Sequence, residues 1–342
     1  MTVKVLQVGA GIRGRHWVQF VKDHPDVTCV GLVEPDPAAV EQAKQITGEP
    51  APPVFADLAT ALDTVEADAV LIVSPSALHA EHTMAALAAG LVVMVEKPFA
   101  VTVAEAERVL ARAKEAGRPV IVAENYRFWP AERTVRALIE EGRIGRIDNA
   151  VMIDRRNMAP ETEGPWLAKL EYAQLQEVAI HHFDSLRYFF DRRPESIAVR
   201  VWNPDWSGYR HGANTEAQID LGDVQVQYLG TLRSRRFGFS LQIEGRDGMI
   251  WTNRKYVLWR PGGSLWWRPV KNVQVPPGDE KSYPRGGTTG LLDSLRDAVR
   301  DGRLAETRGE DNIWTLAMVE AGKLADRERR RVGIREVYAP LS

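Results

Sequence analysis

The chain has 342 residues, which exceeds one typical domain and predicts two. A net charge of −2 does not suit a dedicated nucleic-acid-binding protein. Cys29 is the only cysteine, which excludes a disulfide or a thiolate-rich metal site within the chain, and no apolar run approaches the ~20 residues that span a bilayer. The sequence enters a predicted strand at once, without room for a signal peptide, so we expect a cytoplasmic protein.

In the first 125 residues, apolar strand-like runs alternate with helical stretches. The runs cover 3–8, 28–33, 69–73, 92–95 and 120–123, and the helices about 12–23, 37–46, 77–89 and 102–116, with a short helix near 57–62. Continuous apolar strands separated by helices are typical of a parallel sheet covered on both faces. Such sheets bind ligands beyond the carboxyl ends of their strands, so we expect a site at that edge.

The first run leads directly into Gly9-Ala10-Gly11-Ile12-Arg13-Gly14, and Glu34 closes the next run. In a dinucleotide-binding loop the first glycine permits a tight turn, the second lets the backbone approach a pyrophosphate, and the third lets helix and strand pack closely. The helix N-terminus favours the phosphates, and an acid about 20 residues further on accepts hydrogen bonds from the ribose hydroxyls. A structural glycine turn in another α/β protein is the alternative. The strand–loop–helix context favours a Rossmann dinucleotide-binding domain over residues 1–125.

The same loop gives the first cofactor-binding residues. We assign this role to Gly9, Gly11, Ile12, Arg13, Gly14 and Glu34. Glu34 favours NAD over NADP, because a carboxylate repels a 2′-phosphate. Arg13 and Arg15 lie close enough in sequence to oppose this preference.

Beyond residue 125 the pattern changes to α+β. A helix at about 131–141 precedes alternating strand candidates at 147–156, 196–203, 214–221, 223–232, 237–244, 248–252 and 255–259. These predict an open, largely antiparallel sheet with helices on one face, in a substrate-binding and oligomerisation domain over residues 126–342. Further helices are expected at about 176–190, 288–301 and 310–326, and we allow the region 288–326 to pack back toward the N-terminal domain. The segment 271–287, rich in proline and glycine, is the expected mobile loop.

Two groups of residues carry candidate acid–base chemistry. The run 92–95 ends in Glu96-Lys97-Pro98, which places Lys97 at the carboxyl edge of the sheet. A lysine there can donate to a hydroxyl or carbonyl oxygen, although the tripeptide alone fits a surface lysine equally well. On the helix at 176–190, Glu177 and His181 are four residues apart and Asp184 follows, so a carboxylate can orient a histidine. A metal site or a solvated histidine pair are the alternatives.

Taken together, these residues resemble the glucose-fructose oxidoreductase / inositol dehydrogenase / rhizopine-catabolism (Gfo/Idh/MocA) family of nicotinamide-dependent sugar and polyol dehydrogenases. The resemblance is nearly full length. It rests on Gly9–Gly14, Ser74-Pro75 with His79, Glu96-Lys97-Pro98, Asn125-Tyr126-Arg127-Phe128, Trp166, the Glu177/His181/Asp184 helix and Gly309-Glu310-Asp311.

The resemblance implies a role for each matching position. Lys97 and His181 would contact the reacting hydroxyl, with Glu177 completing a catalytic triad. We assign the cofactor side to Ser74, Pro75, His79, Glu96, Lys97 and Asn125, and substrate binding to Lys97, Tyr126, Arg127, Arg156, Trp166, His181 and His182. No metal is expected. NAD is the expected cofactor, a small carbohydrate the expected substrate, and a homodimer or homotetramer built on the C-terminal sheet the expected assembly.

The chain departs from the family pattern where substrate is expected to bind. Residues 172–176 replace a glycine-rich stretch, Leu167 stands where arginine is common, and Glu177 stands where aspartate is usual. These changes bear on substrate identity more than on hydride chemistry. Two sets of side chains bear on it as well: Trp129, Trp166, Trp202 and Trp206 can stack on a pyranose, and Arg155, Arg156, Arg233, Arg235 and Arg236 can recognise an acidic sugar, although solvated strand faces are the favoured reading of these arginines.

Three functions fit this pattern. The first is a dehydrogenase that transfers hydride between a sugar or polyol hydroxyl and the nicotinamide, with Lys97 and His181 as the acid–base pair. The second is a redox-neutral glycosidase or epimerase that works through transient oxidation. The third is a sensor that retains the fold, which the presence of both Lys97 and His181 disfavours.

Overall fold

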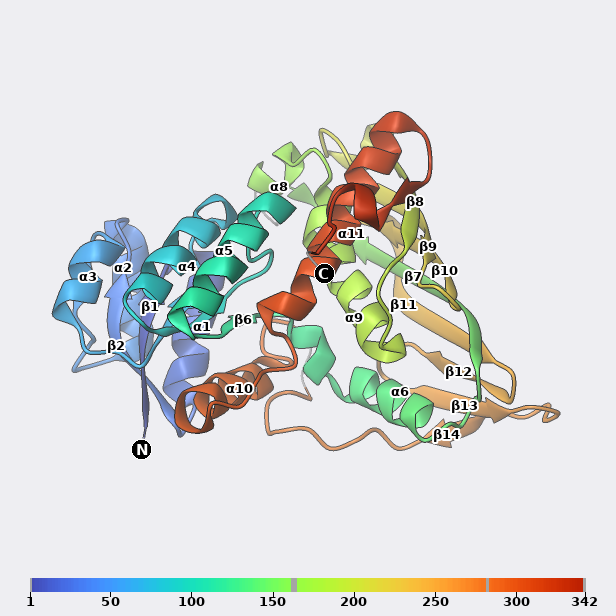
Figure 1. Cartoon of the computed structure of the whole chain (residues 1–342), viewed down its shortest axis with the longest axis horizontal. Helices are drawn as coiled ribbons and strands as arrows, with labels where there is room; N and C mark the ends of the chain where they lie inside the picture. The colour runs from blue at the N-terminus through green and yellow to red at the C-terminus, as the bar shows by residue number, and fades with distance from the viewer. Residues whose placement is uncertain (1, 161–164, 281–282, 341–342) are drawn as a thin grey trace. The chain divides into compact units, whose positions relative to one another are not determined.

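The computed structural model describes residues 2–160, 165–280 and 283–340, and these form two compact units. The first unit holds the residues up to Trp129 together with Val275–Ile313, and the second holds Pro130–Gln274 and the residues from Trp314 on. The expected fold class is confirmed: one unit is built on a parallel Rossmann sheet and the other on a largely antiparallel sheet (Figure 1).

The first unit contains a six-stranded sheet in the order β3-β2-β1-β4-β5-β6, with every neighbouring pair parallel. Its strands are β1 (Val3–Val8), β2 (Val27–Val33), β3 (Val54–Phe55), β4 (Ala69–Ile72), β5 (Val92–Val95) and β6 (Val120–Val122). Strand β3 was not predicted, because two residues are too few for a recognisable apolar run. The order reverses direction between β1 and β4, which is the point where such sheets bind dinucleotides.

Helices cover both faces of this sheet. They are α1 (Ile12–Asp23), α2 (Pro37–Thr47), α3 (Leu58–Thr64), α4 (His79–Ala88), α5 (Val103–Ala116) and α10 (Thr288–Asp301). Helix α1 packs beside α2 and α10, whereas α4 packs beside α3 and α5. Helix α10 comes from the far end of the sequence, yet its Leu291 and Leu295 are fully buried in the same core as Trp17 and Met94.

The second unit contains a nine-stranded sheet in the order β14-β13-β12-β11-β7-β10-β9-β8-β15. Its strands are β7 (Ile147–Asn157), β8 (Ser196–Trp202), β9 (Asn214–Asp220), β10 (Gln225–Thr231), β11 (Arg233–Gly245), β12 (Gly248–Thr252), β13 (Val257–Pro261), β14 (Arg268–Val270) and β15 (Val332–Gly333). All pairs are antiparallel except β7 with β10. The short edge strands β14 and β15 were not predicted from the sequence.

Helices lie on one face of this sheet (Figure 1). They are α6 (Pro130–Glu140), α8 (Pro165–Lys169), α9 (Ile180–Phe190) and α11 (Gly309–Glu328), which begins in the first unit and continues into the second. The structure differs in one respect from the helix predicted at 176–190: Leu175–Ala179 form a π-helical turn, and the α-helix α9 begins only after it. Glu177 lies within that turn, so the backbone from Glu177 to His181 is not the continuous α-helix that was expected. Such π turns are rare and frequently occur at functional sites.

Within the ranges that the structure describes, no α-helix covers the opposite face of the second sheet. Along β7 and β10 the half-buried residues Val151, Ile153 and Leu229 alternate with the buried inner residues, and Trp251 of β12 shares their face by register. Trp259 pairs with the buried Ile250, so it lies on the inner face, and its indole N–H donates to the Arg143 carbonyl (3.1 Å). Trp251 and Trp259 therefore lie on opposite faces of the sheet.

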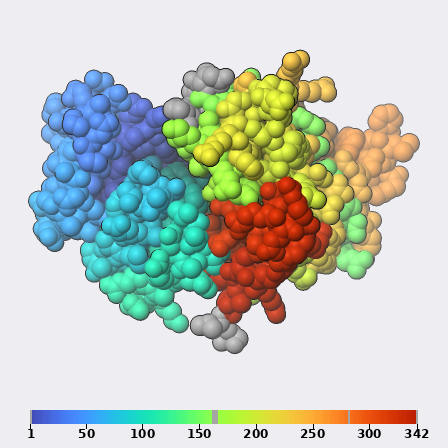
Figure 2. Space-filling view, turned by 90° about the horizontal axis from the view of Figure 1, so that it is seen from above, coloured from blue at the N-terminus to red at the C-terminus, as the bar shows by residue number. Residues whose placement is uncertain are grey.

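The turn between β13 and β14 projects from the second unit (Figure 2). Leu265 and Trp266, in this turn, are about four-fifths exposed. Across the described part of the chain, no helix is long and apolar enough to cross a membrane.

Candidate functional site: a nucleotide-binding loop and a lysine at the sheet edge

The turn after β1 has the backbone that the glycine pattern predicts. Gly9 has φ = +99°, and a Cβ there would lie 2.6 Å from the Val73 carbonyl oxygen. A Cβ on Gly14 would collide with the Gly9 carbonyl group, so helix α1 can approach the turn only with glycine at that position. A Cβ on Gly11, by contrast, would meet no atom within 4 Å. The loop is therefore closed on its protein side and open at Gly11, where a pyrophosphate would approach.

Gln7 holds this loop together and was not predicted. Its side chain is fully buried within β1, and its Nε2 donates to the carbonyl oxygens of both Gly9 and Gly14, each at 2.9 Å. The amide thus ties the start of the turn to the first turn of α1. A glutamine in an apolar strand is the only signal that the sequence offers for this role, since buried polar groups need hydrogen-bond partners.

Glu34 stands at the end of β2, next to the loop. Its Oε2 accepts from the backbone N–H of Ala10 (2.7 Å) and its Oε1 accepts from that of Asp36 (3.0 Å). These contacts fix the carboxylate beside the glycine loop. A carboxylate has about four acceptor positions, so the two that remain suit the hydroxyls of an adenosine ribose.

Arg13 is held by partners that the sequence did not reveal. Its Nε donates to Glu96 Oε1 (2.6 Å), and its guanidinium lies over the rings of Trp17 and Tyr283. The Trp17 indole donates to the same Glu96 oxygen (2.7 Å). Burial alone would raise the pKa of Glu96, but Arg13 and Trp17 lower it to about 2. Glu96 is therefore a permanent carboxylate that anchors Arg13, which argues against Arg13 being available for a 2′-phosphate.

A histidine joins the ends of β4 and β5. The buried His79 places Nδ1 2.7 Å from the Pro98 carbonyl oxygen and Nε2 2.8 Å from the Ser74 carbonyl oxygen. The Lys97–Pro98 peptide is cis, and the Lys97 backbone N–H donates to Glu96 Oε2 (3.1 Å). The backbone on both sides of Lys97 is thus fixed at the carboxyl edge of the sheet. A direct contact of Ser74, Pro75 or His79 with a cofactor stays a prediction.

The segment after β6 is tied to residues just before α10, between α10 and α11, and in the first turn of α11. Asn125 donates from Nδ2 to the Gly286 carbonyl (2.6 Å), and Arg127 pairs with Asp311 (2.5 Å) and donates to the Glu306 carbonyl (2.9 Å). Tyr126 stacks on Trp129 with ring centroids 3.9 Å apart. Arg127 is only 5% exposed, so the structure uses this predicted substrate-binding arginine in a partly buried ion pair.

In the second unit, α9 presents the predicted histidines. His181 is 9% exposed and His182 is fully buried. Nδ1 of His182 lies 2.9 Å from the hydroxyl oxygen of Tyr228, which also accepts from Gln174 Nε2 (2.6 Å). Burial, reinforced by Arg254 and Arg156, holds the pKa of His182 well below its ordinary value. His182 is therefore neutral, and of the pair His181 is the one suited to proton exchange.

The remaining predicted residues of this unit have separate places. Asp184 is buried and accepts from the Thr315 hydroxyl (3.3 Å). Arg156 pairs with the buried Asp154 (2.7 Å), and Trp166 on α8 is half exposed. Tyr228 was not singled out from the sequence, because it fits an ordinary core position in β10, and Gln174 was noted only as part of the segment that departs from the family pattern.

A cavity of about 480 Å³ lies elsewhere in the second unit. It combines members of the tryptophan and arginine sets predicted for sugar recognition: Trp202, Trp206, Arg233 and Arg235. Trp202 and Thr231 belong to the sheet face without helices, so the cavity opens on the side opposite α9. His181 does not line this cavity, so we do not assign the cavity to the candidate catalytic site.

The residues of the first unit fit a dinucleotide. When a dinucleotide is bound, the open space at Gly11 would face the pyrophosphate, the fixed carboxylate of Glu34 the ribose, and the lysine at the sheet edge the nicotinamide end. Among the residues that the structure describes, no group of three His, Cys, Asp or Glu side chains is placed to hold a metal ion.

Comparison with curated proteins gives relatives of modest identity. The chain is 30% identical over 229 residues to an uncharacterised protein of Sinorhizobium fredii, a match that spans 63% of that protein. It is 25% identical to a D-apiose dehydrogenase of Paraburkholderia graminis, over 97% of this chain and 90% of the relative. It is 24% identical to an NADP(+)-dependent scyllo-inositol 2-dehydrogenase of Bacillus subtilis, over 87% and 83%.

Solved structures and family models also relate the chain to oxidoreductases. An oxidoreductase from Agrobacterium radiobacter, solved with NAD+, L-tartaric acid and magnesium, superposes with a TM-score of 0.87 at 18% identity, over 99% of this chain and all of the other, which shows a shared fold. The model of the oxidoreductase family with an NAD-binding Rossmann fold matches residues 3–124, and the model of the GFO/IDH/MocA C-terminal domain matches residues 133–251. The chain therefore belongs to the GFO/IDH/MocA family of oxidoreductases.

Proposed function

We propose that the protein is an NAD(P)-dependent dehydrogenase that acts on a secondary hydroxyl of a sugar, polyol or sugar derivative. The observation that carries this proposal is the position of Lys97. It is the second residue after β5, at the same carboxyl edge of the parallel sheet as the glycine loop, with its backbone held by Glu96. Two relatives, the D-apiose and scyllo-inositol dehydrogenases, support a carbohydrate substrate.

Each proposed catalytic residue has a distinct part in this reaction. The nicotinamide supplies the hydride chemistry when it is bound. Lys97 donates a hydrogen bond to the substrate oxygen and stabilises the negative charge that develops there. His181 accepts the hydroxyl proton, and Glu177 orients its imidazole. The neutral state of His182 leaves His181 as the proton carrier of α9.

A panel of sugars, polyols and glycosides, assayed with NAD and with NADP, tests the proposal. Formation of NADH or NADPH together with an oxidised product supports the dehydrogenase. Turnover of a glycoside or an epimer without net reduction of added cofactor would instead establish the redox-neutral alternative. Absence of both, with retained cofactor binding, would favour a sensor.

The cofactor preference is a prediction of its own. We expect a higher kcat/KM with NAD than with NADP, because Glu34 is fixed beside the glycine loop and Arg13 is engaged by Glu96. In the variant Glu34→Ala the NAD/NADP ratio should fall by roughly tenfold or more, since like charges brought together cost several kcal/mol. Glu41→Ala, an exposed change on α2, is the matched control. A wild-type preference for NADP would contradict this assignment.

The assembly is a second prediction. We propose that the helix-free face of the second sheet forms a two-fold interface, because its half-buried Val151, Ile153 and Leu229 form an apolar strip that monomers rarely expose. Light scattering should then give about two or four times the 38.2 kDa chain mass. Ile153→Glu should shift the protein toward monomer, whereas Gln45→Glu, an exposed change on α2 of the first unit, should not. A wild-type mass near that of one chain would contradict the proposal.

A further inference from the structure

A buried carboxyl group lies beside Lys97 at the edge of the first sheet. Strands β5 and β6 are parallel, with Val95 opposite Val122, and the Ala123 backbone N–H donates to the Val95 carbonyl (2.8 Å). Lys97 and Glu124 are each the second residue after this pair. The register therefore carries both side chains to the same place at the carboxyl edge, and Glu124 is completely buried there.

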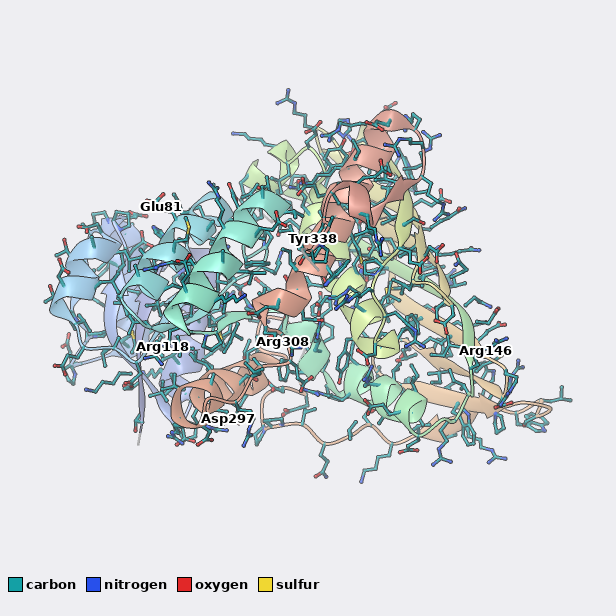
Figure 3. All side chains as sticks on the ribbon, viewed as in Figure 1. Glu81, Arg118, Arg146, Asp297, Arg308 and Tyr338 are labelled. Atoms are coloured by element: carbon teal, nitrogen blue, oxygen red, sulfur yellow. The ribbon has the colours of Figure 1, made fainter. Side chains whose placement is uncertain are left out.

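The charged and hydrogen-bonding groups that face Glu124 come from three segments. Glu96 and Lys97 follow β5, Arg127 follows β6, and the side chain of Asn312, at the start of α11, hydrogen-bonds the carboxyl group. The segment before α11 runs alongside β6, because the backbone of Arg308 (labelled in Figure 3) forms an antiparallel β-bridge with Ile121.

Two of these groups are bound to other partners. Glu96 is engaged by Arg13 and Trp17, and Arg127 is paired with Asp311. Burial raises the pKa of Glu124 to about 7; Lys97 opposes this rise most strongly, followed by Arg127, while Glu96 adds to it. The interaction is reciprocal, so an ionised Glu124 raises the pKa of Lys97 by the same free energy.

Retention of this carboxyl group costs stability. Its pKa in the folded chain lies above that of an ordinary glutamate, so the folded state binds the proton more tightly than the unfolded state. The stability from that tighter binding is complete below about pH 4.5 and is lost as the pH rises toward 7. An apolar residue would avoid this loss, which points to a role outside packing.

We propose that Glu124 is the positioning residue of Lys97: its carboxylate keeps the Lys97 ammonium protonated and aimed at the oxygen of the substrate. The proposal rests on the function proposed above for Lys97. No covalent step is involved, because Glu124 acts on the substrate only through Lys97. Lys97 can then donate a hydrogen bond at a pH where a desolvated lysine would otherwise lose its proton.

Competitive acetylation of lysines measures this effect without a substrate. Acetic anhydride labels only unprotonated amines, so the labelling of Lys97 against pH, followed by mass spectrometry, gives its pKa. In Glu124→Gln the pKa of Lys97 should fall by about 1–3 units, the usual effect of one adjacent opposite charge, and its labelling at pH 8 should rise tenfold or more. Glu107→Gln removes the same charge from the exposed side of α5 and should leave Lys97 unchanged.

Two further measurements keep the proposal testable if Glu124→Gln does not fold. Glu124→Asp should restore part of the Lys97 pKa, and in the wild-type protein the labelling curve of Lys97 should show an inflection near pH 7, where Glu124 ionises. An unchanged Lys97 pKa in folded Glu124→Gln, or a wild-type curve with a single inflection, would overturn the proposal. If the linkage is found but Lys97→Ala retains full turnover, the proposed function of Lys97 fails instead.

Discussion

Replacement of Lys97 by alanine is expected to lower kcat by about 10²–10⁴-fold, the usual effect of removing a positioned acid–base group. The reason is its location: the lysine follows β5 at the carboxyl edge of the sheet, and Glu96 fixes its backbone. NAD affinity should change little, because the loop and Glu34 contacts are independent of the Lys97 side chain. Steady-state kinetics and NADH fluorescence titration measure the two effects separately.

The matched control for this variant is Lys44→Ala, which removes an exposed lysine from α2 of the same unit. It should retain wild-type kcat. If Lys97→Ala turned over at a rate near that of Lys44→Ala, the lysine would have no part in the chemical step.

His181→Ala is expected to have an effect of similar size, about 10²–10⁴-fold on kcat, because it removes the proposed proton acceptor. Its neighbour His182 cannot replace it, being fully buried and held neutral. The limb of the pH–kcat profile that reports ionisation of the histidine should disappear in the variant. His211→Ala removes an exposed histidine of the same unit and serves as the control. A profile that kept this limb in His181→Ala would assign the proton transfer to another group.

The periodicity of apolar residues in the sequence predicted most of the strands and helices. Helix α1 (Ile12–Asp23) and strand β1 (Val3–Val8) have the predicted limits, because a glycine turn separates two clear periodicities. Strands β3 and β15 have two residues each and exist only because longer neighbours pair with them. A local pattern cannot predict such strands.

The site was predicted where backbone geometry demands a residue type, and missed where a long-range contact sets the role. Gly9 and Gly14 are required by a positive φ and a close approach, so the sequence pattern alone identified them. The Arg13–Glu96 pair joins residues 83 positions apart, and only the β5–β6 register brings Glu124 beside Lys97. The π turn before α9 likewise interrupts the continuous α-helix assumed for Glu177.

Transfer of deuterium from cofactor to carbohydrate tests the central claim most directly. NADH carrying deuterium at both C4 positions of the nicotinamide is incubated with the protein and a panel of keto-sugars and keto-polyols, and each reduced product is examined by mass spectrometry and NMR. The proposed reaction predicts one deuterium on the carbon that becomes the secondary alcohol, and the rate of label transfer should fall by about 10²–10⁴-fold when Lys97→Ala replaces the wild type. Reduced products without deuterium, or label transfer unaffected in Lys97→Ala, would contradict it.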